Sequence, residues 1–194
     1  MSSRSIAQES TRRRLSPRQA DTVRRLTDAA VEELRAVGYS ALTVRNVAAR
    51  GGVAPATAYT YFSSKNHLVT EVFWRRLRDL PQEATAEPSA VGRVVTVLRQ
   101  LALLVVDEPE LASACTAALL GDDPDVIHLR EEIGREWHRR LSEALGEDAD
   151  PAVLRTLETS LVGAFIHTGL GYGSYERMAD QLESSARLIM EGRS

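Results

Sequence analysis

Hydrophobic side chains recur every three or four residues along most of this chain, which is the spacing of one face of an α-helix. The first such segment begins at Ser16-Pro17, ends at Gly38 and has its apolar face at Val23, Leu26, Ala30, Leu34 and Val37. A serine before a proline favours a helix start, and a glycine favours a helix end. The alternation typical of β-strands does not emerge in the sequence, so we predict an all-α protein of about nine helices.

Two short helices are predicted after the first one, with a glycine turn between them. Thr43 caps the earlier helix, and the later one runs from Pro55 to about Phe62. Gly51-Gly52 supplies the backbone freedom that a sharp turn needs. Three helices, of which the last two are short and joined by a turn of about four residues, are typical of a helix-turn-helix.

The chain beyond this motif has the pattern of longer helices separated by prolines and glycines. We therefore predict a flexible basic arm over residues 1–15, a helix-turn-helix DNA-binding domain over residues 16–64 and a helical ligand-binding and dimerisation domain over residues 65–194. No apolar run reaches the roughly 18 residues of a membrane-spanning helix, and no signal peptide is evident, so we expect a cytoplasmic protein without a membrane partner. The single cysteine, Cys115, excludes an internal disulfide.

Charge is distributed unevenly along the chain, although the formal net charge is only −3. Residues 1–78 contain 14 lysines and arginines against 6 aspartates and glutamates, whereas residues 79–194 contain 10 against 21. A basic head on an acidic body is expected of a phosphate-binding module joined to a second module with another role. Together with the helix-turn-helix, this asymmetry indicates double-stranded DNA as the partner of the head.

Catalysis is not expected of this chain. Its histidines, at positions 67, 128, 138 and 167, lack the spacing of a metal site, although His128 and Glu132 share a helix face. The sequence also lacks a glycine-rich phosphate loop, a nucleophile elbow and a cysteine–histidine signature. We therefore predict that the protein is not an enzyme and has no catalytic residues, metal or cofactor.

The most specific signal lies between Leu42 and Phe73, where the chain reads LTVRNVAARGGVAPATAYTYFSSKNHLVTEVF. The residues that carry it are Thr43-Val44, Val47-Ala48, Gly52-Val53, Thr57, Tyr59, Tyr61-Phe62, Lys65 and Leu68. At this spacing they resemble the signature of the TetR family of bacterial repressors, over about residues 20–70. The resemblance implies a homodimer that binds palindromic operator DNA and is released by a small-molecule effector. Two positions depart from the pattern, since the family usually has serine where this chain has Ala54 and alanine where it has Gly51.

Candidate DNA contacts lie on both helices of the motif and at the start of the following helix. They are Thr43, Arg45, Pro55, Ala56, Thr57, Tyr59, Thr60, Tyr61 and Lys65. Small residues at the start of a recognition helix suit thymine methyl groups, whereas hydroxyl and cationic side chains suit phosphates. The resemblance implies phosphate contacts for Tyr59 and Lys65 and a backbone or base contact for Tyr61. Two alternatives stay open: Arg45 is only a solvated charge, and one tyrosine packs beneath the helix with Phe62.

The last two predicted helices carry the candidate dimer surface. Small residues on the eighth helix form a ridge that lets another helix approach closely, and apolar residues on the ninth extend it. The candidates are Ser160, Ala164, Thr168 with His167 as its alternative, Gly171, Met178, Leu182 and Ile189. The resemblance implies a four-helix bundle built from these two helices of each protomer. Ordinary packing within one chain is the alternative.

A candidate effector pocket lies in the apolar body. The resemblance implies a pocket among the fifth to eighth helices, and its candidate lining is Leu103, Leu104, Cys115, Leu119, Trp137, Leu141, Phe165 and His167. Few charges are expected there, which favours an apolar or lipid-like effector with His167 as a polar anchor. Binding would favour a dimer whose heads are spaced wrongly for successive major grooves, with Leu77 and Leu80 as the transmission element. A DNA-binding regulator without a ligand, an activator and a protein adaptor remain alternatives.

Overall fold

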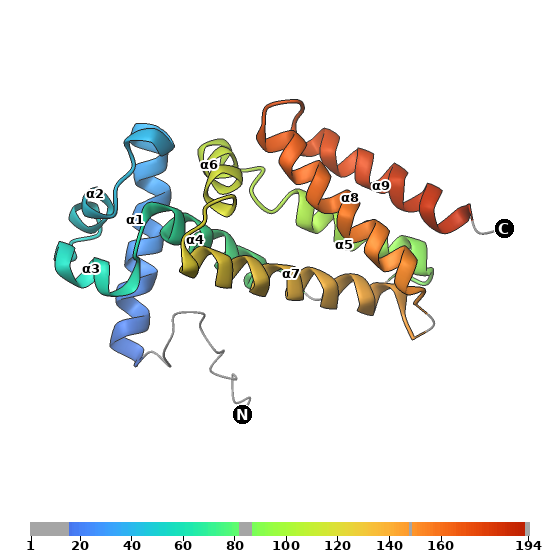
Figure 1. The fold of residues 1–194 in the computed structure, drawn as a ribbon, viewed down its shortest axis with the longest axis horizontal. Helices are drawn as coiled ribbons and strands as arrows, with labels where there is room; N and C mark the ends of the chain where they lie inside the picture. Colours follow the sequence, from blue (N-terminus) through green and yellow to red (C-terminus); the bar gives the residue numbers. More distant parts are fainter. Residues whose placement is uncertain (1–15, 82–86, 148, 193–194) are drawn as a thin grey trace.

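The computed structural model describes residues 16–81, 87–147 and 149–192, and within these residues the chain forms nine helices and no strand (Figure 1). The all-α prediction is confirmed, whereas the basic arm predicted for residues 1–15 lies outside the described residues. The helices are α1 (Pro17–Ala41), α2 (Val44–Arg50), α3 (Pro55–Tyr61), α4 (Lys65–Asp79), α5 (Ala90–Ala102), α6 (Pro109–Leu119), α7 (Pro124–Leu145), α8 (Pro151–Gly169) and α9 (Tyr175–Glu191). Among the described helices, none is both long and apolar enough to span a membrane.

Local signals determine where α1 begins and ends. The backbone N–H of Ser16 donates to Gln19 Oε1 at 2.9 Å, and the Ser16 hydroxyl accepts from the Gln19 backbone N–H at 3.4 Å. This reciprocal pair is a capping box, and Pro17 follows it in the first turn. The sequence predicts that the helix ends at Gly38, and Gly38 does leave the helical conformation with a φ of 70°, but α1 resumes for one further turn and ends at Ala41.

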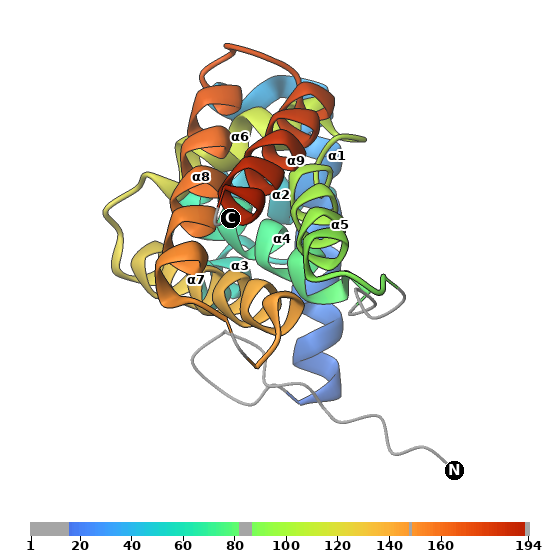
Figure 2. The ribbon, with the colours of Figure 1, turned by 90° about the vertical axis from the view of Figure 1, so that its right-hand side faces the viewer.

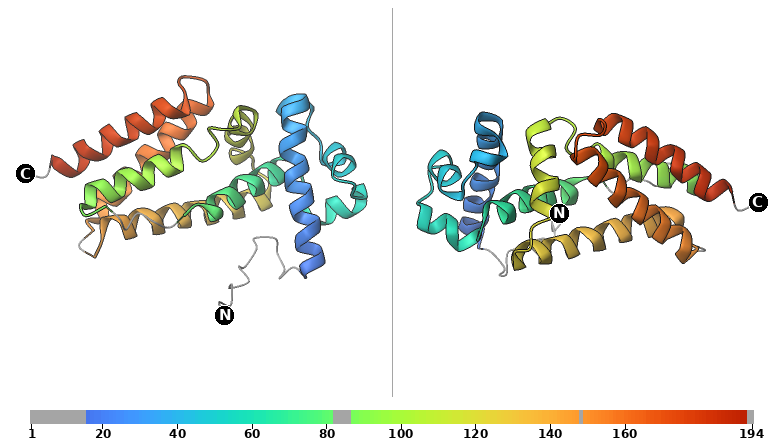
Figure 3. Two further views of the ribbon diagram at one scale, coloured as in Figure 1. Left: turned by 180° about the vertical axis from the view of Figure 1, so that it is seen from behind. Right: turned by 45° about the horizontal axis from the view of Figure 1, so that its top comes forward.

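The helices form a head and a body that are joined by α4. Figure 1 shows α1, α2 and α3 at one end, and both Figure 1 and Figure 3 place α2 and α3 on the side of α1 that faces away from the body. At the opposite end α8 and α9 lie side by side, with α5 packed against α9 and α7 (Figure 2). Helix α6 contacts α1, α4 and α8, so it lies between the head and the far end of the body.

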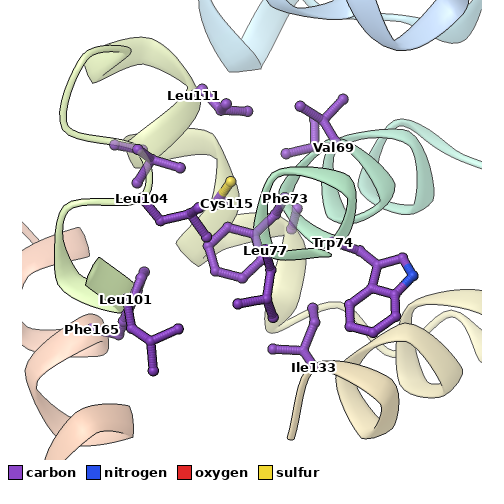
Figure 4. Packing of buried hydrophobic residues seen from close by; sticks show 14 of the residues in the cluster. Val69, Phe73, Trp74, Leu77, Leu101, Leu104, Leu111, Cys115, Ile133 and Phe165 are labelled. Atoms are coloured by element: carbon purple, nitrogen blue, oxygen red, sulfur yellow. The ribbon is translucent and has the colours of Figure 1, made fainter. Parts of the chain in front are cut away.

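One continuous hydrophobic core runs through both parts, and α4 lies at its centre. Phe73 and Leu77 of α4 are fully buried, and in Figure 4 they lie between Cys115 of α6 and Ile133 of α7. Because packed interiors do not deform freely, a displacement of α6 or α7 would also displace α4. The predicted transmission residue Leu77 is part of this core, and Leu80 packs at its edge.

A buried arginine of α7 holds the C-terminal end of α4. Arg140 donates from Nη2 to the carbonyl oxygens of Leu77 at 3.1 Å and Leu80 at 3.2 Å, and from Nη1 to that of Pro81 at 3.0 Å. Its Nε donates to Glu136 at 2.7 Å, which balances the buried charge. A cation at the C-terminal carbonyls of a helix is favourable because it opposes the helix dipole. Arg140 therefore fixes the end of α4 against α7.

Candidate nucleic-acid interface

Helix α3, the second helix of the motif, lies on the surface of the head. Of its seven residues Ala58 is buried, and Phe62, directly after the helix, is fully buried as well. These two side chains attach α3 to the core and leave its opposite side open to solvent. Ala54 provides no side-chain hydrogen bond to the start of the helix, as its departure from the family pattern predicts.

The two tyrosines of α3 have different environments. Tyr59 is 53% exposed, whereas Tyr61 is half-buried and packs against the hydrophobic core. Tyr61 is therefore the tyrosine of α3 that packs against the core, and its contact with DNA stays a prediction. The other candidate contacts on α3 are all exposed and comprise Pro55, Ala56, Thr57 and Thr60.

Helix α2 presents its own candidate contacts at its N-terminus. The Thr43 hydroxyl accepts a hydrogen bond from the Asn46 backbone N–H at 3.1 Å, so Thr43 is the N-cap that the sequence predicts. Its side chain is nevertheless exposed, and so is that of Arg45 two residues further on. A hydroxyl and free amides at a helix N-terminus form an arrangement that favours a phosphate.

Lys65 has partners within the protein. Its Nζ donates to the Tyr39 carbonyl oxygen at 2.9 Å and to that of Ser40 at 3.4 Å. The same ammonium lies 4.4 Å from the centre of the Tyr39 ring. Lys65 therefore joins the first turn of α4 to the end of α1, and its contact with a DNA phosphate stays a prediction.

A network of charged side chains connects the head to the body. Arg35 of α1 donates from Nε to Glu108 Oε2 at 2.8 Å, and its Nη2 contacts the other carboxylate oxygen. Arg76 of α4 lies 3.5 Å from Glu108 and 3.0 Å from Asp107. The hydrogen bond from Arg35 lowers the pKa of Glu108, although burial opposes this effect. The ionised carboxylate thus joins α1 and α4 at the start of α6.

A second contact between head and body joins the N-caps of α4 and α7. The Ser64 hydroxyl donates to Asp123 Oδ2 at 2.5 Å, and the adjacent Ser63 hydroxyl donates to Asp125 Oδ2 at 2.8 Å. Burial raises the pKa of Asp123, but the hydrogen bonds from Ser64 and from the backbone N–H groups of Asp125 and Val126 outweigh it and leave the pKa below its usual value. The loop that follows α3 is therefore tied directly to the body.

Most of the predicted pocket residues belong to the hydrophobic core, in which aromatic rings cluster around Phe165. The Phe165 ring centre is 5.6 Å from that of Trp137 and 5.7 Å from that of Phe73. Leu104, Cys115 and Leu141 are buried in the hydrophobic core, and Leu103 and Leu119 pack against it. Burial raises the pKa of the Cys115 thiol to about 12, so the thiol is neutral. Trp137 Nε1 is buried and has no hydrogen-bond partner among the described residues.

His167 does not belong to this cluster. Its side chain is exposed, and its ring centre lies 5.1 Å from that of Tyr172 in the turn after α8. Two residues along a helix correspond to about 200° of rotation, so His167 and the buried Phe165 point to different sides of α8. This corrects the prediction that His167 is a polar anchor within the core.

The candidate dimer residues fall into two groups. Met178, Leu182 and Thr168 are 1%, 2% and 7% exposed within a single chain, so the intramolecular alternative holds for them and the dimer prediction is corrected. Ser160 and Ala164 border an open groove between α8 and α9, to which α9 contributes residues such as Arg177 and Leu188. Gly171 is exposed in the turn between the two helices, and Ile189 is partly buried against the core.

An exposed apolar row on α8 was missed by the sequence reasoning. Val162, Ile166 and Leu170 are 44%, 37% and 62% exposed, and Leu188 of α9 is 76% exposed. Their spacing of four residues along α8 was visible in the sequence. It was missed because a second apolar row, Leu157, Leu161 and Phe165, runs along the same helix and is buried.

Comparison with known proteins covers both the head and the body. Residues 26–72 match the sequence pattern of the bacterial regulatory proteins of the tetR family. An HTH-type transcriptional regulator of Mycobacterium tuberculosis is 48% identical over 177 residues, which cover 90% of this chain and 83% of that protein. The crystal structure of a TetR transcriptional regulator from Rhodococcus sp. RHA1 has a TM-score of 0.73 at 22% identity, covering 92% of this chain and 100% of that one. Thermus thermophilus FadR, a TetR-family repressor in complex with lauroyl-CoA, has a TM-score of 0.69 at 21% identity, covering 89% of this chain and 95% of that one.

Proposed function

Because this chain belongs to the TetR family of bacterial regulatory proteins, we propose that it is a repressor that binds palindromic operator DNA as a homodimer and leaves it when a small apolar molecule binds the body. The observation that carries the proposal is the exposed face of α3, at the end of the molecule where the chain has its excess of positive charge. The chain is a transcriptional regulator, so we propose no enzymatic activity for it.

DNA recognition follows from the position of α3. The major groove admits an α-helix, and a recognition helix enters it with its N-terminal half. In this chain the exposed Pro55, Ala56 and Thr57 would then meet base edges, and their small side chains favour thymine methyl groups. Phosphates on either side would be held by the remaining candidates, which are Thr43, Arg45, Tyr59, Thr60, Tyr61 and Lys65.

Dimerisation is proposed through α8 and α9. One helix-turn-helix reads only one half-site, and a two-fold dimer presents two heads to half-sites one helical turn apart. A two-fold interface uses the same surface on both partners, which suits the exposed apolar row of α8. This surface consists of Val162, Ile166 and Leu170. The groove lined by Ser160, Ala164 and Leu188 lies on a different side of α8, because residues two positions apart on a helix are rotated by about 200°.

Ile166→Glu is expected to convert the dimer into a monomer, because two carboxylates would meet across the two-fold axis and lose their hydration. Sedimentation velocity measures the change directly. Ile127→Glu is the matched control, since Ile127 is also an isoleucine on a helix, with 40% exposure against 37% for Ile166, but lies on α7. A dimer that survives Ile166→Glu and dissociates in Ile127→Glu would place the interface elsewhere.

Effector binding is proposed in the cluster around Phe165. Its aromatic and aliphatic side chains offer an apolar environment, and Trp137 Nε1 offers one hydrogen-bond donor to an acceptor on the ligand. Helix α4 reaches this cluster through Phe73 and carries the head at its other end. A ligand that favours one position of α4 would therefore shift the population of dimers that fit two successive major grooves.

The proposal is tested by selecting bound fragments of genomic DNA with the purified protein and mapping the protected bases. We expect a palindrome whose half-site centres are about 10 base pairs apart or a multiple of it. Transcription in vitro from the selected promoter should then fall when the protein is added, and lauroyl-CoA, the molecule bound by the Thermus protein, is the first effector to add. Failure to select any sequence would contradict DNA recognition by α3, and increased transcription would make the protein an activator.

A regulator that works without an effector is the second candidate. The observation that favours it is the close packing of the body, in which Cys115 and Leu141 are fully buried and the aromatic rings around Phe165 are in contact. The two candidates differ in thermal unfolding, because a ligand that binds only the folded state raises the melting temperature. A series of acyl-CoA molecules that raises the melting temperature and releases DNA would exclude this second candidate.

A further inference from the structure

The recognition helix depends on its surroundings for its direction. Helix α3 has seven residues and no side-chain cap at Ala54. Isolated helices of fewer than about 12 residues are marginal in water, so α3 is not held straight or oriented by its own hydrogen bonds. Its C-terminal end is attached to the core by Phe62, whereas its N-terminal end follows directly on the turn after α2. Whatever fixes this turn also sets the angle at which α3 leaves the head.

Arg25 of α1 holds this turn. Its Nη2 donates to the Gly51 carbonyl oxygen at 2.6 Å and to the Gly52 carbonyl oxygen at 3.0 Å. Both carbonyls lie at the C-terminal end of α2, where a cation is favourable because it opposes the negative end of the helix dipole. The partners are 26 and 27 residues apart in sequence, so this contact joins α1 to the turn across the head.

The two glycines let the turn lie directly on α1. Gly52 has a φ of 62°, and a Cβ at this position would be 3.1 Å from Arg25 Nη2. A Cβ at Gly51 would be 3.3 Å from the Val47 carbonyl oxygen and 3.4 Å from both Ala29 Cβ and the Arg25 carbonyl oxygen. A side chain at Gly52 would compete with the Arg25 guanidinium for this space, and one at Gly51 would require its neighbours to shift by a few tenths of an ångström. Gly51, one of the two departures from the family pattern, thus belongs to the same contact as Arg25.

We propose that Arg25 is a positioning residue for DNA recognition, which orients α3 by holding the turn and does not itself contact phosphate. The proposal rests on the function proposed above, because it concerns the DNA-bound use of α3. The competing role for an exposed arginine in a basic head is a phosphate contact. The two roles predict different results, since a phosphate contact contributes equally on every sequence, whereas the orientation of α3 matters most for the contacts with bases, which form on the operator and not on random DNA.

Salt dependence separates the two roles. Loss of one phosphate contact reduces the slope of log K against log salt concentration by about 0.9 per protomer and weakens operator and random DNA alike. Loss of a positioning residue leaves this slope unchanged and weakens the operator complex selectively. The measurement uses the selected operator and a scrambled duplex, both of about 30 base pairs, over a series of salt concentrations.

Arg25→Met is expected to lower operator affinity about tenfold per protomer, or about 100-fold for a dimer on two half-sites, and affinity for the scrambled duplex less than about twofold. The reason is that DNA binding must then supply the ordering of α3 that the hydrogen bonds from one charged donor supply in the wild type. Arg24→Met is the matched control, because it removes the same charge from the preceding position of α1. The Arg24 guanidinium pairs with Asp21 and not with the turn. Urea unfolding of each variant gives the fraction of folded protein by which affinities are corrected. Equal losses on both duplexes with a reduced salt slope, or no loss in Arg25→Met beyond that in Arg24→Met, would overturn the proposal.

Amide hydrogen exchange of the free protein provides a test that does not need DNA. In Arg25→Met the amides of residues 52–62 are expected to exchange faster than in Arg24→Met, while those in the middle of α1 are unchanged. Unchanged exchange over residues 52–62 would contradict the positioning role, even if the protein binds its operator. If the amides of residues 52–62 exchange faster in Arg25→Met but the wild-type protein selects no DNA, then Arg25 does hold the turn and it is the proposed function that is wrong.

Discussion

Gly169→Ala is expected to destabilise the protein by roughly 3 kcal/mol, at the upper end of the cost of overpacking a core. Gly169 is the last residue of α8, and a Cβ there would lie 2.5 Å from Thr116 Cβ and 2.7 Å from Thr116 Cγ2, with Oγ1 closer still. Threonine is short and branched at Cβ, so its side chain cannot turn away and α6 or α8 must move. The midpoint of urea unfolding measures the loss.

The matched control is Gly134→Ala. Gly134 is also a helical glycine, within α7, but nothing lies within 4 Å of a Cβ built at this position. Alanine there removes the entropic cost of glycine in a helix and should stabilise the protein by about 0.5–1 kcal/mol. If the free energy of unfolding of Gly169→Ala equals or exceeds that of Gly134→Ala, then α6 and α8 separate without cost and the predicted clash is wrong.

Tyr59→Ala is expected to reduce operator affinity about 100-fold without changing stability. A hydrogen bond to a charged phosphate contributes about 1.5 kcal/mol, which is roughly tenfold in affinity per protomer and squares to about 100-fold for a dimer on two half-sites. Tyr59 is 53% exposed in the free head, so its removal leaves no cavity in the core. Fluorescence titration of the selected operator measures the affinity, and thermal unfolding checks the stability.

Tyr59→Phe tests the chemical basis of this loss. Phenylalanine retains the ring and removes only the hydroxyl that would donate to phosphate. We expect a loss close to that of Tyr59→Ala, because the hydroxyl is the group that carries the predicted contact. Wild-type affinity in both variants would remove Tyr59 from the interface, and wild-type affinity in Tyr59→Phe alone would show that the ring makes the contact.

The boundaries of the head follow from interactions between near neighbours in the sequence. The capping box at Ser16, the proline after it and the positive φ of Gly38 act within a few residues, so the pattern alone predicts α1. Thr43 is likewise a local cap, and the missing cap at Ala54 was visible before any fold was known. The spacing from Thr43 to Leu68 predicts the family, and the comparisons agree with it.

Partners of long side chains could not be predicted in the same way. The resemblance implies a phosphate contact for Lys65, and it gives no sign that its ammonium also binds the carbonyl oxygens at the end of α1. From the sequence, Arg25 could be recognised only as one of the positive charges of the head. In the folded chain its guanidinium donates to the carbonyl oxygens of the turn before α3. Such contacts join residues more than 20 positions apart, and a flexible cation has many partners within reach until the backbone is folded.

The helix-turn-helix, its basic charge and the all-α class were thus determined by the sequence, because helix caps, glycine turns and hydrophobic periodicity are local. The tertiary structure alone decided which face of each body helix is buried. On α9 the apolar Met178 and Leu182 pack inward and Leu188 lies outside, and on α8 His167 points away from the Phe165 cluster. The physical reason is that a helix with apolar residues on two sides can bury either one, and only the packing of its neighbours selects the side that remains exposed.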